Sequence, residues 1–155
     1  MRTLIHVPKT GGTSIGKEED IIKLPHRVDW STVKNVENLF IIFRDPIERF
    51  ISSFFAFRKT FEEYTPDTEG INQLINKLET DEYLKLQILD GNIRPFIHWI
   101  NECVHKVKVI KFEDYPFVYN LNKSNKTDVI LTKKSIEILK RIYSKDYEYK
   151  KLFLD

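Results

Sequence analysis

The chain has 155 residues, of which 41% are hydrophobic, and its 25 basic and 23 acidic residues give a net charge of +2. This length and composition are typical of one soluble folded domain over residues 1–155, and the near balance of charge argues against a nucleic-acid partner. No apolar run approaches the ~20 residues of a membrane span, and the strand-like start leaves no room for a signal peptide. The lone Cys103 cannot form an internal disulfide, so we expect a cytoplasmic protein.

The first elements are expected to be two strands separated by a short helix. Residues 3–7 (TLIHV) are rich in β-formers and precede Pro-Lys-Thr-Gly-Gly, which predicts a strand ending in a loop. Thr13 and Ser14 can cap a short helix over residues 14–22. The unbroken apolar run LFIIF over residues 39–43 predicts a strand covered on both faces.

A helix with clear signals follows the second strand. Asp45 is a good N-cap, Pro46 suits the first helical position, and Glu48 completes a capping box. An apolar stripe at helical spacing comes next: Ile47, Phe50, Ile51, Phe54 and Phe55. Further along, the pattern predicts helices over residues 70–79, 81–89, 94–105 and 133–144, a strand over 106–112 and a loop over 118–131. This order predicts an α/β three-layer sandwich with a mostly parallel central sheet.

The loop after the first strand, PKTGGTSIGKE (8–18), is of a kind that binds phosphate. A strand that runs into a glycine turn and a helix exposes backbone N–H groups. Gly11, Gly16 and Lys17 fit the ATP and GTP loop G-x-x-x-x-G-K-[ST]. Glu18, however, stands where that loop needs a magnesium-binding hydroxyl, which weakens this interpretation.

The other interpretation starts from Lys9, at the end of the strand. PKTGGTS (8–14) resembles the 5′-phosphosulfate loop of sulfotransferases, whose donor is 3′-phosphoadenosine 5′-phosphosulfate (PAPS). The resemblance implies that Lys9 reaches the oxygen bridging phosphorus and sulfur. It assigns the 5′-phosphate to the residues that wrap it: Thr10, Gly11, Gly12, Thr13 and Ser14. A glycine turn that binds nothing is the structural alternative.

A second motif, IIFRDPIERFISSFF (41–55), resembles the 3′-phosphate motif of the same family. There, an arginine follows a strand and a serine comes eight residues later, the spacing of Arg44 and Ser52. A guanidinium can contact a phosphate at two points, and Ser52 lies about two turns into the helix, off the apolar stripe. The alternatives are a surface ion pair of Arg44 with Asp45 or Glu48 and a solvent-facing Ser52. Both motifs in this order favour PAPS binding.

The chain thus resembles a compact PAPS-dependent sulfotransferase of the carbohydrate type, similar in pattern to heparan sulfate O-sulfotransferases. The resemblance implies a P-loop-like nucleotide-binding fold, sulfuryl transfer to an acceptor hydroxyl, preferably of a saccharide, adenosine 3′,5′-bisphosphate as product and no metal. LPHRVDW (24–30) is similar to a segment whose histidine is the catalytic base, which gives that role to His26. LNKSNK (121–126) resembles the donor-closing loop and gives donor contacts to Lys123 and Ser124.

Some residues depart from the family pattern, and other function classes stay open. Asn92 and Phe96 replace the His and Gln of a His-x-x-Pro-Gln element, which leaves the acceptor undefined. His6 alternates within a strand and is expected to be a packed residue rather than a catalyst. The alternatives are an ATP kinase-like phosphotransferase built on Lys17 and a non-catalytic nucleotide-binding protein of the same fold.

Overall fold

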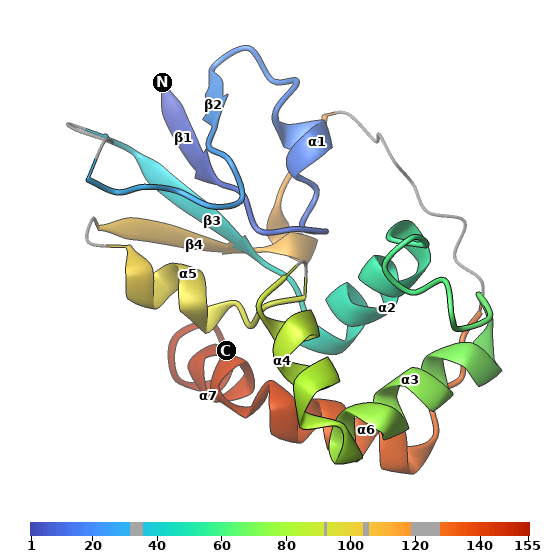
Figure 1. The fold of residues 1–155 in the computed structure, drawn as a ribbon. Coiled ribbons are helices and arrows are strands. Elements are labelled where there is room, and N and C mark those ends of the chain that lie inside the picture. The colour runs from blue at the N-terminus through green and yellow to red at the C-terminus, as the bar shows by residue number, and fades with distance from the viewer. Residues whose placement is uncertain (32–35, 92, 104–105, 119–127) are drawn as a thin grey trace. The chain divides into compact units, whose positions relative to one another are not determined.

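The chain forms two compact units, shown in Figure 1. The first consists of Met1–Arg44 and Phe96–Lys123, and the second of Asp45–Pro95 and Ser124–Asp155. The computed structural model describes residues 1–31, 36–91, 93–103, 106–118 and 128–155. Each unit has its own cluster of buried apolar side chains. No helix in these ranges is long and apolar enough to cross a membrane.

The first unit is built on a four-stranded sheet in the order β2-β1-β3-β4, and every neighbouring pair is parallel. Its strands are β1 (Arg2–Ile5), β2 (Ile21–Lys23), β3 (Leu39–Phe43) and β4 (Val107–Lys111). The predicted α/β class with a parallel central sheet is therefore confirmed. All five residues of β3 are buried, as expected for a strand that packs on both faces.

Side chains of β1 and β3 alternate between two apolar layers, as the pleat requires. One layer contains Leu4, Phe40 and Ile42 together with residues from the following segments: Ile15 of α1 (Gly12–Ile15), Ile21 of β2, and Tyr115, which follows the 3-10 turn η1 (Phe112–Asp114). On β3, Phe43 meets Phe96 edge to face, with ring centroids 4.9 Å apart. Phe96 directly precedes α5 (Ile97–Glu102). Burial of each such aliphatic or aromatic side chain stabilises the sheet by about 1.5–3 kcal/mol.

The strand order places a topological switch between β1 and β3. The chain passes from β1 to β2 on one side and then returns to β3 on the other side. In open parallel sheets, ligands bind outside the carboxyl ends of the strands at such a switch. Lys9 follows β1 and Arg44 follows β3 at these carboxyl ends. Lys9 and Arg44, two of the predicted donor-binding residues, therefore flank the position that the topology favours.

The described part of the second unit is helical. Its helices are α2 (Pro46–Ala56), α3 (Thr68–Thr80), α4 (Glu82–Leu89), α6 (Lys133–Ile142) and α7 (Ser144–Phe153). Helix α6 packs against α2, α3 and α7. The core contains the following buried side chains: Phe50, Phe54, Phe61, Ile71, Leu74, Ile75, Leu78, Ile88, Ile93, Ile138, Leu139 and Tyr143. Phe50 and Phe54 of the predicted apolar stripe are therefore confirmed as inward-facing.

Helix α2 begins as its sequence predicts. The Asp45 carboxylate accepts hydrogen bonds from the backbone N–H groups of Ile47 and Glu48 at 3.0 and 3.1 Å, and Pro46 is the first helical residue. These bonds satisfy donors that have no partner inside the helix. Arg49 is buried on the same helix and donates to the carbonyl of Arg94. Its role is thus to hold the second unit together.

One prediction of secondary structure is wrong, and one helix has no counterpart in the predictions. The helix expected over residues 14–22 is only the single turn α1, whose N-cap is Gly11 and not Thr13 or Ser14. Residues 21–23 form β2, because they pair with β1 from Arg2↔Ile21 onward, and this pairing overrides the helix-forming Lys-Glu-Glu segment before it. Helix α7 was not predicted, since its exposed Leu152 and Phe153 give no apolar stripe.

Candidate functional site

The glycine loop has a backbone shape that ordinary residues adopt only at a cost. Lys9 has φ of 61° and Gly11 has φ of 82°, both in the left-handed region. The buried Thr10 hydroxyl donates to the carbonyl of Val7 at 2.7 Å, which ties the loop back to its strand. Left-handed residues other than glycine are concentrated at functional sites. The loop is therefore both specifically shaped and internally fixed.

Gly11 and Gly12 of the loop are both in close contact with aromatic side chains. A Cβ atom on Gly11 would lie 2.4 Å from Cε1 of Phe117, and one on Gly12 would lie 2.0 Å from Nε2 of His6. These separations are far below van der Waals contact. The two glycines are consequently needed for the loop to lie against Phe117 on one side and His6 on the other.

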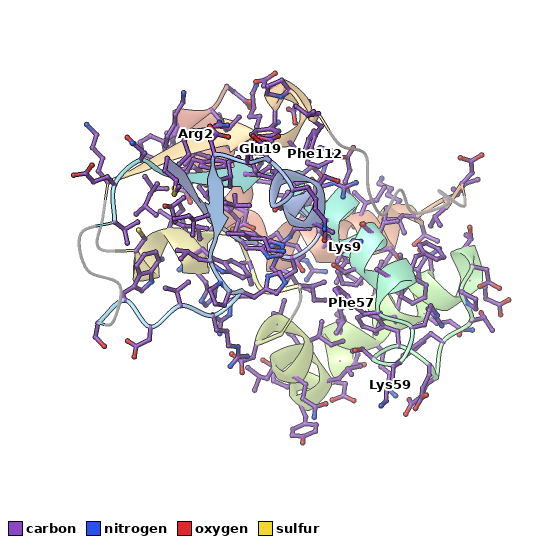
Figure 2. All side chains as sticks on the ribbon, turned by 90° about the horizontal axis from the view of Figure 1, so that it is seen from above. Arg2, Lys9, Glu19, Phe57, Lys59 and Phe112 are labelled. Atoms are coloured by element: carbon purple, nitrogen blue, oxygen red, sulfur yellow. The ribbon has the colours of Figure 1, made fainter. Side chains whose placement is uncertain are left out.

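Lys9 and Arg44 meet at this loop. Arg44 Nη1 donates to the backbone carbonyl of Lys9 at 3.0 Å, and its guanidinium carbon lies 4.6 Å from the ring centroid of Phe112. Burial, followed by the positive charge of Arg44, lowers the pKa of Lys9. Figure 2 labels Arg2, which begins β1, and Lys9, which lies beyond the other end of that strand. The loop thus gathers two cations, the electrostatic basis of an anion site.

His26 is held in a defined tautomer. Its Nδ1 lies 2.8 Å from the carbonyl oxygen of His6, and because a carbonyl only accepts, Nδ1 must carry the proton. In neutral His26 the lone pair is then on Nε2, the atom that can accept a proton. The indole Nε1 of the buried Trp99 donates to the His26 carbonyl at 3.0 Å. The segment after β2 is therefore anchored to the residues around α5.

His6 lies beside the candidate site, which its sequence pattern did not predict. Its ring is half-buried beside Gly12, and its centroid lies 3.8 Å from that of His26, with the planes tilted by 34°. Burial, followed by the charges of His26 and Lys23, lowers the pKa of His6 to about 3. The expectation of a packed histidine is confirmed. Its position between the glycine loop and His26 could not be read from alternation within one strand.

The lowered pKa of His6 predicts a loss of stability in mild acid. The unfolded chain gains a proton on this residue below its ordinary pKa of about 6.5, whereas the folded chain stays neutral down to about 3. Stability is therefore full above pH 6.5 and falls as the pH decreases. One proton can change the free energy of unfolding by at most about 1.4 kcal/mol per pH unit. The expected change is smaller than this limit, because the ring is partly exposed.

This prediction can be measured by denaturant unfolding at several values between pH 7.5 and pH 5. The slope of stability against pH should be smaller in His6→Phe than in the unsubstituted chain, since all other titrating groups are shared. Equal slopes in the two proteins would contradict the assignment of a neutral, acid-sensitive His6.

The remaining predicted donor residues have different surroundings. Thr13 is exposed and Ser14 is buried within α1. Ser52 is buried on α2 of the second unit, so the alternative of a solvent-facing serine is wrong. Lys123 and Ser124 lie outside the described residues.

Lys17 and Glu18, which the alternative ATP loop would use, lie after helix α1. Helix α1 ends at Ile15, with Gly16 as its C-cap, so the exposed Lys17 follows the helix. Glu18 accepts a hydrogen bond from the Tyr115 hydroxyl at 2.9 Å and pairs with Arg2 at 3.5 Å. Glu18 is therefore part of a structural network at the start of β1.

The described residues contain no group of three or more His, Cys, Asp and Glu side chains that could hold a metal ion. Comparison of the chain with family models, curated proteins and solved structures finds no match.

Proposed function

We propose that this chain is a PAPS-dependent sulfotransferase that moves a sulfuryl group to an acceptor hydroxyl, preferably of a saccharide. The observation that carries the proposal is the meeting of Lys9 and Arg44 at the glycine loop, joined by the 3.0 Å bond from Arg44 to the Lys9 carbonyl. Two cations that repel each other are stabilised by a ligand with several negative charges. The three-layer sulfotransferase fold and a single domain over 1–155 belong to the same proposal.

The donor is bound mainly by the loop and by the arginine beside it. Lys9 contacts the bridging oxygen, and the 5′-phosphate lies against the wrapping residues 10–14. Because the Thr10 hydroxyl already donates to Val7, Thr10 contributes its backbone. Arg44 holds the 3′-phosphate in this proposal. The resemblance to the family also assigns donor contacts to Ser52, Lys123 and Ser124, which stay predictions.

The reaction is an in-line displacement at sulfur. The acceptor oxygen forms a bond to sulfur, the bond from sulfur to the bridging oxygen breaks, and the bridging oxygen leaves with the electron pair. His26 takes the acceptor proton on Nε2, a role typically worth roughly 10²–10⁴-fold in rate. Lys9 stabilises the negative charge that develops on the leaving oxygen. Positioning and electrostatics supply the rest, as in phosphoryl transfer.

Loss of the Arg44 guanidinium is expected to weaken donor binding more than turnover. Arg44→Ala removes charge-assisted hydrogen bonds worth about 1.5–3 kcal/mol, or roughly 10- to 150-fold in the dissociation constant. Arg44→Lys keeps the charge but not the planar fork, so its affinity should be intermediate. Calorimetric titration with adenosine 3′,5′-bisphosphate measures the effect. Unchanged affinity in Arg44→Ala would remove this residue from the donor site.

The kinase-like alternative makes a different binding prediction. A loop built on Lys17 would bind ATP with magnesium, but Lys17 follows α1 and Glu18 is bonded to Tyr115 and Arg2. This arrangement favours the interpretation built on Lys9. We expect calorimetry to show binding of adenosine 3′,5′-bisphosphate and at least tenfold weaker binding of ATP with magnesium. The reverse order would favour the kinase.

The non-catalytic alternative is tested by turnover. A protein of this kind would bind the bisphosphate but release none from PAPS when an acceptor is added. The tautomer of His26 supports an enzyme, because its unprotonated Nε2 is suited to take a proton. A panel of saccharides, small alcohols and tyrosine peptides, with labelled PAPS as donor, identifies the acceptor class.

A further inference from the structure

The ring of His6 lies between the glycine loop and the imidazole of His26. The backbone of Gly12 is so close that an added Cβ would be 2.0 Å from His6 Nε2 and 2.1 Å from its Cδ2. The His26 ring lies 3.8 Å from His6, centroid to centroid. The loop, the His6 ring and the His26 ring are thus in consecutive contact.

His26 depends on this contact for its orientation. The residue is exposed, and an exposed side chain ordinarily samples several rotamers. Here, its Nδ1 donates to the His6 carbonyl and its ring rests on the His6 ring. The bond from Trp99 fixes only the backbone of His26. The described contacts that hold the imidazole itself therefore both come from His6.

We propose that His6 is a positioning residue for His26: its carbonyl keeps the proton on Nδ1, and its ring, seated on Gly12, aims Nε2 at the acceptor hydroxyl. The inference rests on the proposed function, in which His26 is the base. His6 does not touch the reacting atoms. The His6 ring contacts both Gly12 of the donor-binding loop and the His26 imidazole. In this proposal it therefore helps to place the base relative to the donor.

The charge state of His6 suits this role. His6 faces Lys23 on β2, His26 in the following segment and the backbone of Gly12. Burial, followed by the electrostatic effects of His26 and Lys23, lowers the pKa of His6 to about 3, so the ring is neutral at working pH. A neutral ring does not repel His26 when that residue takes up a proton in each turnover.

The test compares His6→Ala, which removes the ring, with His6→Phe, which keeps a ring of similar shape. Both retain the backbone carbonyl. In a PAPS-dependent transfer assay, His6→Ala should lower kcat by roughly 10- to 100-fold, the cost of a misplaced group. Its affinity for adenosine 3′,5′-bisphosphate should stay within about twofold, because the ring is not a donor contact. His6→Phe should recover most of kcat.

A pH profile separates positioning from a merely structural role. In His6→Phe the acid limb of kcat should move to higher pH, because the face of a benzene ring attracts protonated His26. Wild-type kcat and pH profile in His6→Ala would overturn the proposal. Equal losses of kcat and of bisphosphate affinity in that variant would also overturn it, since they would show general damage to the loop.

Nitrogen NMR of labelled histidines makes the result independent of catalysis. Neutral His26 should show the Nδ1–H tautomer in the unsubstituted chain. In His6→Ala the carbonyl remains, but no ring holds the imidazole against it, so a mixture of tautomers is expected. A single unchanged tautomer in the variant would overturn the positioning role even if the protein transfers no sulfuryl group. If the unsubstituted chain lacks transfer but the tautomers change as expected, the proposed function fails alone.

Discussion

Lys9→Ala is expected to reduce sulfuryl transfer to the background of the assay, a loss of at least roughly 10²–10³-fold in kcat. Lys9 faces the bond that breaks in our proposal, and without its ammonium the leaving oxygen develops negative charge with no cation beside it. Burial and then the charge of Arg44 lower the pKa of Lys9, and a negatively charged donor beside the ammonium would offset both effects. Initial rates at saturating PAPS measure the loss.

Lys17→Ala is the matched control for this substitution. Lys17 lies in the same loop and is exposed beyond the end of α1, so its removal should leave transfer within about twofold of the unsubstituted rate. Full activity in Lys9→Ala would contradict the assignment of the leaving-group lysine. Loss in Lys17→Ala alone would select the ATP-type loop.

His26→Asn is expected to lower kcat by roughly 10²–10⁴-fold, the usual value of a general base. Asparagine can still donate to the His6 carbonyl, as His26 Nδ1 does at 2.8 Å, but it offers no basic nitrogen to the acceptor. Donor affinity should therefore be retained. Steady-state kinetics and calorimetry with the bisphosphate measure the two quantities separately.

The control for the base is His98→Asn. His98 is exposed on α5 and is not assigned to the site, so its substitution should leave kcat within about twofold. Unchanged kcat in His26→Asn would show that His26 is not the base. Equal losses in both variants would indicate a general effect of removing histidine.

The sequence correctly predicts those helices and strands whose own residue pattern matches their burial and capping in the fold. The run LFIIF is buried throughout as β3, and Asp45 caps α2 with two hydrogen bonds. By contrast, β2 has three residues, of which Ile21 is buried and Ile22 is exposed, and its strand form depends on pairing with β1. That pairing is a long-range contact, and local propensity does not contain it.

The same distinction applies to the candidate site. Lys9 and Arg44 each follow a strand in the sequence, and the parallel pairing of β1 with β3 explains why the two residues meet. The ring contact between His6 and His26 joins residues twenty positions apart and depends on the register of β2. Trp99 and Phe117 reach the site from more distant segments. Contacts between segments so far apart in the sequence cannot be predicted from local residue patterns and become visible only in the folded structure.

The central claim is tested most directly by acceptor-dependent release of adenosine 3′,5′-bisphosphate from PAPS by the full chain. This product forms whichever hydroxyl receives the sulfuryl group, so one readout serves the whole acceptor panel. We expect release to require an acceptor, to be highest with a saccharide and to be lost in Lys9→Ala. Binding of the bisphosphate with no release for any acceptor would contradict catalysis and leave a non-catalytic nucleotide-binding protein.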